Sequence, residues 1–111
     1  MYNLEERTLK FSVDVRKFLK ELPNSVLNSE DSKQLVRSSG SVGANYIEAN
    51  ESLSKKDFNM RAKICRKEAK ESKYWLRLLD PPAELQDERQ SLLQESTELT
   101  SIFGSIVRKC E

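Results

Sequence analysis

Residues 34–48 read QLVRSSGSVGANYIE, and no other stretch says as much about how this chain folds. Alternating spacings of four and three, which are typical of an amphipathic helix, separate Leu35, Ser39, Val42 and Tyr46. One flank of that helix carries Ser38, Ser41, Asn45 and Glu48, where a helix that packs only through aliphatic side chains would carry leucine or valine. The stretch therefore predicts a helix that meets a neighbour through polar side chains.

The same heptad spacing extends from this stretch towards both ends of the chain and predicts four helices. Asn3 with Glu6, and Ser54 with Asp57, have the spacing of capping boxes at the starts of the first and third helices. Prolines follow the first and third helices and end them. We predict helices at residues 4–22, 26–53, 55–80 and 83–110. No segment alternates with period two and the connections are short, so we predict an all-α, up-down-up-down antiparallel four-helix bundle, one domain over residues 1–111.

The composition narrows the classes of function. The chain has 111 residues, 37% hydrophobic and 33% charged, which fits a soluble globular domain without a membrane span or signal-peptide run. It contains no histidine, the commonest general base and metal ligand, so we expect neither an enzyme nor a cofactor. The predicted bundle separates Cys65 from Cys110 by roughly 18 Å, too far for a disulfide. Two reduced cysteines indicate the cytoplasm.

Polar residues on the facing flanks of the second and third helices predict a partly buried network, because a half-buried carboxylate must be paired. We call this set the polar seam: Arg37, Ser38, Ser41, Asn45, Glu48, Arg61, Glu68 and Glu71. If the chain turns near residue 54, three sets of residues are predicted to lie side by side on the two helices: Glu48 with Arg61, Ser41 with Glu68, and both Ser38 and Arg37 with Glu71. The alternative is that these flanks are simply solvated, and the sequence leaves open whether the seam lies within or between subunits.

A metal site and a phosphate-binding loop are two other interpretations, and both fit the sequence poorly. A two-metal site of the kind found in some four-helix bundles needs Glu-x-x-His pairs, which a chain without histidine does not have. Gly40 and Gly43 lack the preceding strand and the Gly-Lys-Ser/Thr ending of a phosphate-binding loop. We therefore expect no metal, and we read the glycines as places where another helix, of the same chain or of another subunit, packs closely.

Charge is segregated along the chain, although the net charge is only +1. Residues 55–77 contain nine basic and three acidic residues, whereas residues 78–111 contain three basic and seven acidic ones. The basic residues form an outward ridge on the third helix, with Tyr74 set into it. We call this set the basic ridge: Lys63, Arg66, Lys67, Lys70, Lys73 and Arg77. Such a ridge is typical of nucleic-acid contact, although it can also be an ordinary solvated face.

Several elements within residues 10–80 together resemble the 23S rRNA-intervening-sequence proteins. They are Gln34-Leu35, Arg37, Ser41-Val42-Gly43, Asn45, Glu48-Ala49, Glu68-Ala69, Glu71 and Tyr74-Trp75-Leu76. The resemblance implies a compact four-helix bundle that assembles as a homopentameric ring, and it implies no catalytic residues. A similar branch, the accessory variability proteins of diversity-generating retroelements, acts as basic rings that partner a reverse transcriptase and nucleic acid. This chain departs from the common pattern at Tyr46, inside the Asn-x-x-Glu element, and in its acidic fourth helix.

These observations lead to competing functions. We expect a non-enzymatic oligomeric adaptor that contacts RNA or a nucleic-acid enzyme through the basic ridge, with no membrane and no small-molecule substrate. The alternative is a protein-interaction or assembly scaffold without nucleic-acid binding. The third hypothesis is an enzyme that uses a pair of carboxylates.

Overall fold

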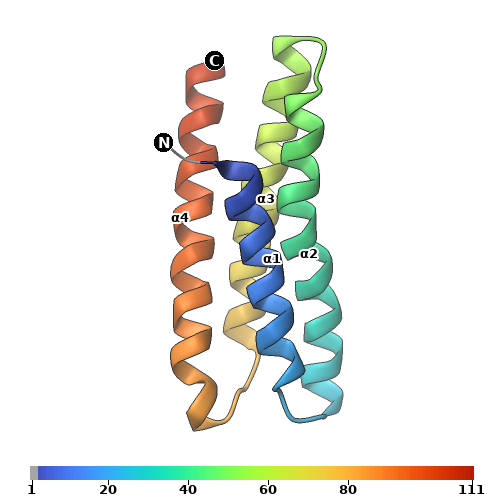
Figure 1. Cartoon of the computed structure of the whole chain (residues 1–111), viewed down its shortest axis with the longest axis vertical. Coiled ribbons are helices and arrows are strands. Elements are labelled where there is room, and N and C mark those ends of the chain that lie inside the picture. Colours follow the sequence, from blue (N-terminus) through green and yellow to red (C-terminus); the bar gives the residue numbers. More distant parts are fainter. Residues whose placement is uncertain (1–2) are drawn as a thin grey trace.

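The computed structural model describes residues 3–111, so the first two residues of the predicted domain lie outside the described part. Four long helices make up this part: α1 (Leu4–Lys20), α2 (Val26–Asn50), α3 (Lys55–Leu78) and α4 (Gln86–Cys110). A single 3₁₀ turn, η1 (Ala83–Leu85), leads into α4. Each helix runs antiparallel to the one before it, as Figure 1 shows, so the predicted all-α bundle is confirmed for the described residues.

Side-chain caps set the beginnings of the first three helices. Asn3 Oδ1 accepts a hydrogen bond from the Glu6 amide at 3.2 Å, and Ser54 Oγ accepts one from the Asp57 amide at 3.1 Å. Asn3 and Ser54 are therefore confirmed as N-caps, whereas the return bond from the Glu6 or Asp57 side chain, which completes a capping box, is not formed within residues 3–111. Ser25 Oγ caps α2 in the same way, through the amide of Asn28 at 3.0 Å. These bonds satisfy amides at the helix start that have no partner within the helix.

The first three helices end two or three residues earlier than the spacing predicted. α2 stops at Asn50 rather than at residue 53, because the backbone of Ser54 must be extended to cap α3 (φ −144°, ψ 159°) and the chain must leave the helix first. Leu53, which continues the heptad spacing of Val42, Tyr46 and Ala49, is consequently 98% exposed. Leu79 is likewise extended at the end of α3.

The core runs the length of the bundle and contains side chains from all four helices. Its largest fully buried members are Phe11, Phe18, Leu35, Leu76, Leu99 and Phe103. In the last turns of α4 the buried residue is Val107, whereas Ile106 and Cys110, which continue the heptad spacing of Leu99 and Phe103, are only partly buried. A straight helix has 3.6 residues per turn, so a strict heptad stripe drifts around it and the buried position shifts by one residue.

Gly43 is the place where α1 and α2 approach most tightly. A β-carbon built at Gly43 would lie 3.0 Å from Thr8 Oγ1 and 3.3 Å from Thr8 Cβ. The Thr8 side chain is itself buried, with Oγ1 donating to the carbonyl of Leu4 at 2.7 Å. The close packing inferred for this glycine is therefore made within the chain.

The helices are unequal in length, and this leaves part of the bundle uncovered. α1 has 17 residues, against 24 or 25 in the other three helices, so the α2–α3 hairpin projects beyond the start of α1 (Figure 1). Within residues 3–111, no helix combines the length and the apolar character that crossing a membrane requires.

Candidate nucleic-acid interface

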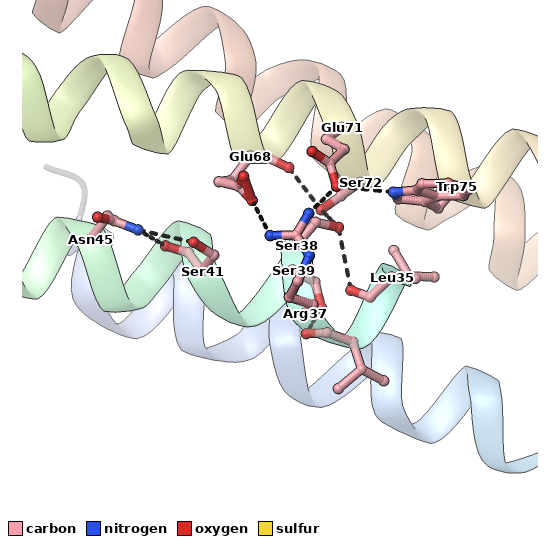
Figure 2. Close-up of polar contacts among 11 residues, drawn as sticks. Leu35, Arg37, Ser38, Ser39, Ser41, Asn45, Glu68, Glu71, Ser72 and Trp75 are labelled. Atoms are coloured by element: carbon pink, nitrogen blue, oxygen red, sulfur yellow. Dashed lines mark hydrogen bonds and ion pairs between the residues drawn. The ribbon is translucent and has the colours of Figure 1, made fainter. Parts of the chain in front are cut away.

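Arg37 is the centre of the polar seam between α2 and α3 (Figure 2). Its guanidinium contacts Glu68 Oε2 at 3.2 Å and also pairs with Glu71. Burial lowers the pKa of Arg37, but the Glu68 and Glu71 carboxylates outweigh it, so the net shift of this pKa is upward. Glu68 is 4% exposed, so Arg37 compensates a carboxylate that water hardly reaches.

Hydroxyl and amide groups continue the seam on either side of Arg37. Ser38 Oγ and Ser72 Oγ lie 2.9 Å apart, both buried, and Ser72 Oγ also donates to the carbonyl of Glu68. Asn45 Nδ2 donates to the carbonyl and the hydroxyl of Ser41, both at 2.9 Å. The structure thus brings Ser38 against Ser72, rather than Glu71, and keeps Ser41 on its own helix, rather than against Glu68.

The predicted pair between Glu48 and Arg61 is wrong. Arg61 donates to Asn45 Oδ1 at 2.9 Å, and the exposed Glu48 carboxylate has no partner within residues 3–111. The register of the hairpin is close to the predicted one, since the short side chains of Ser38 and Ser72 meet. The long Arg61 side chain instead reaches about one turn along α2, to the amide of Asn45, and Glu48 lies exposed.

Replacing Glu48 by alanine should therefore change the free energy of unfolding by less than about 0.5 kcal/mol, as for most surface substitutions. The measurement is chemical denaturation of the two proteins at neutral pH. The matched variant is Asn45→Ala, which leaves the Arg61 guanidinium without its acceptor and should cost about 1 kcal/mol. A larger loss for Glu48→Ala than for Asn45→Ala would contradict this assignment.

The basic ridge lies on the outward face of α3, as predicted. Lys63, Lys67, Lys70 and Arg77 are exposed, and Arg66 and Lys73 are half-buried. Lys63 Nζ lies 3.7 Å from Glu111 Oε1, near the end of α4. The other five members form no ion pair within the part of the chain that the structure describes.

Four of the carboxylates on α3 and α4 are engaged away from the ridge. Within α3, Arg37 holds Glu68 and Glu71 on the flank that faces α2. On α4, Glu95 and Glu98 face α1, where Arg7 binds Glu95 through two bonds of 2.8 Å and Glu98 at 3.0 Å.

Those two α4 carboxylates line a groove of about 450 Å³ between α1 and α4, away from the ridge. Hydrogen bonds from Gln94 and Arg7 lower the pKa of Glu98, so it stays ionised there. The ridge therefore keeps most of its positive charge.

Two aromatic rings lie at the end of the ridge. The ring centroids of Tyr74 and Trp75 are 5.1 Å apart with an interplanar angle of 76°, an edge-to-face contact. Trp75 Nε1 donates to Glu71 Oε2 at 3.1 Å, which joins this pair to the polar seam. This bond was not predicted, although the spacing of four between Glu71 and Trp75 places the two side chains side by side on a helix.

The cysteines and carboxylates form no reactive cluster in the described residues. Burial raises the pKa of Cys65 to about 12, so this thiol, which lies 3.3 Å from the carbonyl of Val42, is neutral at physiological pH. Both Cys65 and Cys110 are free thiols. Within residues 3–111, no three Cys, Asp or Glu side chains come together as ligands for a metal ion.

The fold and the seam define the chain as a small antiparallel four-helix bundle with a polar α2–α3 interface. The family model of the 23S rRNA-intervening sequence proteins matches residues 3–105, so the chain belongs to this family. It is also similar to a crystal structure of a protein of unknown function from the S23 ribosomal protein family of Bacteroides thetaiotaomicron. That comparison gives 35% identity and a TM-score of 0.78, over 93% of this chain and 96% of the other. No curated protein matches the chain.

Proposed function

We propose that this chain is a non-enzymatic cytoplasmic protein that binds the phosphate backbone of RNA through the basic ridge, as one subunit of a homo-oligomeric ring. The observation that carries this proposal is that carboxylates of the chain neutralise little of the positive charge of the ridge. Five of its six cations have no ion pair within residues 3–111, and the nearest carboxylates of α3 are held by Arg37 on another flank.

The dimensions of the ridge suit a polyanion. From Lys63 to Arg77 it extends about 21 Å along one straight helix, at about 1.5 Å per residue. Long cationic side chains spaced along such a line can each meet a phosphate and release a counterion. The contacts carry no base information, so this mode of binding is sensitive to salt and indifferent to sequence.

A ring would make such a surface useful. One ridge offers a few phosphate contacts and binds weakly by itself. When one ridge of an assembly has bound an RNA, the effective concentration of that RNA at the remaining ridges is high, so the assembly binds more tightly than a single ridge. We propose the pentamer as this assembly, on the strength of the family to which the chain belongs.

The test is charge reversal. Replacing Lys63, Lys67 and Lys70 together by glutamate should abolish binding of a structured RNA, measured by fluorescence anisotropy across a salt series. The matched control reverses three exposed lysines of α1 and α2, namely Lys17, Lys20 and Lys33, with the same change in net charge. It should bind like the wild type, with an unchanged slope of log K against log salt.

Circular dichroism must show the same helix content for both variants and the wild type. Retained binding by the ridge variant would show that the ridge is the wrong surface. Equal losses in both variants would show that only the net charge matters. Either result overturns the assignment.

The second candidate is an assembly scaffold, and one observation favours it. At the end of the bundle where α2 begins, Val26 and Leu27 are 80% and 76% exposed. They border a hollow of about 570 Å³ together with Pro23, Pro81 and Pro82. Native mass spectrometry separates the two functions. A ring that takes up RNA at low salt and releases it at high salt supports the first, and a ring that ignores RNA throughout supports the scaffold.

A further inference from the structure

Tyr74 interrupts the line of cations on the outward face of α3. The residues at this face follow the helical spacing Lys63, Lys67, Lys70, Tyr74, Arg77. Tyr74 is 56% exposed, and its hydroxyl makes no hydrogen bond within residues 3–111. A large ring that faces solvent between two uncompensated cations does not contribute to the core.

Contacts with Trp75 and, through it, with α2 hold the ring of Tyr74 in place. Its neighbour Trp75 is fixed by the bond from Nε1 to Glu71, and Glu71 is fixed by Arg37 of α2. Trp75 meets Tyr74 edge-to-face at 5.1 Å. This chain of contacts from α2 restrains the aromatic pair, so little side-chain freedom remains to be lost when a ligand binds.

We propose that an unpaired base stacks on Tyr74 while Lys70 and Arg77 hold the phosphates on either side of it, so that the ridge binds single-stranded RNA in preference to duplex. This inference rests on the proposed function and specifies its ligand. Along the helix axis, Lys70 lies about 6 Å before Tyr74 and Arg77 about 4.5 Å after it, within reach of consecutive phosphates for two long side chains.

Stacking on an exposed aromatic ring is the usual way in which proteins bind single strands without reading their sequence. In a duplex the bases are already stacked on one another, and a side chain on a convex helix face cannot reach their planes. A duplex can therefore use the cations of the ridge but not the ring of Tyr74.

The experiment uses an RNA strand of about 12 nucleotides, a length within the usual range of single-strand sites, both alone and annealed to its complement. The chain contains one tryptophan, so intrinsic fluorescence reports on the aromatic pair, and anisotropy of labelled RNA gives the affinity. Tyr74→Ala removes the ring, and Tyr74→Phe is the matched control that keeps it.

We expect the wild type to bind the single strand more tightly than the duplex, with a change in Trp75 fluorescence only for the single strand. Tyr74→Ala should weaken single-strand binding by about fivefold to 150-fold, the range measured for base stacking on aromatic side chains. It should leave duplex binding and the salt slope unchanged, because no charge is removed. Tyr74→Phe should stay within about twofold of the wild type.

The experiment distinguishes a failure of the proposed function from a failure of the stacking inference. If the wild type binds neither RNA at low salt, the proposed function is wrong and this inference falls with it. If the wild type binds RNA but Tyr74→Ala binds the single strand as tightly, or loses single-strand and duplex binding equally, the ridge binds RNA and the stacking inference alone is overturned.

Discussion

Replacing Gly43 by valine should lower the free energy of unfolding by about 3 kcal/mol, the upper part of the usual range for overpacking a core. A β-carbon at this position would already lie 3.0 Å from Thr8 Oγ1, and its nearest backbone neighbour is the Thr8 carbonyl carbon at 3.7 Å. Thr8 cannot swing aside easily, because its side chain is buried and Oγ1 is bonded to the carbonyl of Leu4. Two further methyl groups would push α1 away from α2.

Gly40 provides the matched control in the same helix. The atoms nearest to a β-carbon there are Arg16 NH2 and Ser12 Oγ, both at 3.9 Å and both at the ends of side chains. Gly40→Ala should therefore raise the free energy of unfolding by about 0.5–1 kcal/mol, since alanine is the better helix former. Guanidinium denaturation, with the slope m compared between proteins, measures both changes.

A double variant tests the cause of the loss at Gly43. Thr8→Ala removes the hydroxyl that lies 3.0 Å from a β-carbon at position 43, but it keeps the Thr8 β-carbon at 3.3 Å. Gly43→Ala should therefore cost less stability in the Thr8→Ala background than in the wild type, which is a coupling between neighbouring residues. If the costs are equal, Gly43 is required for a reason other than its contact with Thr8.

The helices and their caps were predictable from the sequence because they depend on residues close together in the chain. An N-cap bond joins two residues three apart, so Asn3 and Ser54 could be recognised as caps without knowing the fold. The position of the ridge was predictable for the same reason. The spacing of Lys63, Lys67 and Lys70 places them on one helix face whatever the neighbours of that helix are.

The partners across helices were less predictable because they depend on the register of the α2–α3 hairpin. Adding or removing one residue in the connection shifts a helix by about 1.5 Å and turns it by about 100° relative to its neighbour. Ser38 meets Ser72 within one residue of the predicted level, and Arg37 meets Glu71 as predicted. Asn45 and Glu48 lie about one turn apart on α2, so which of them Arg61 contacts depends on the conformation of a long side chain, which the sequence does not specify.

The contacts of Arg7 could not be predicted from any local pattern. Arg7 and Glu95 are separated by 88 residues and meet only because the bundle closes α4 against α1. This contact holds Glu95 and Glu98 at the groove between α1 and α4, away from the ridge. The sequence revealed the segregation of charge but left open whether α4 neutralises α3.

Replacing Arg37 by methionine should lower the free energy of unfolding by about 2–3 kcal/mol at neutral pH. The variant leaves the buried carboxylate of Glu68 without its cation, and breaking one side of a buried pair costs about 3–5 kcal/mol. We expect less than the full amount because the Arg37 side chain is 52% exposed, so water can enter the space that it leaves. Thermal or chemical denaturation measures the loss, and Trp75 fluorescence should change because Glu71 loses its other partner.

Lys33 is the matched control for a lost cation on α2, since its contact with Glu30 is 3.8 Å long and lies at the surface. Lys33→Met should change stability by less than about 0.5 kcal/mol. The double variant Arg37→Met with Glu68→Met should recover most of what Arg37→Met loses, because an apolar pair of similar size has no buried charge to compensate. If the double variant is as unstable as the single one, the loss comes from the contact with Glu71 and from packing. The unpaired Glu68 carboxylate would then not be its cause.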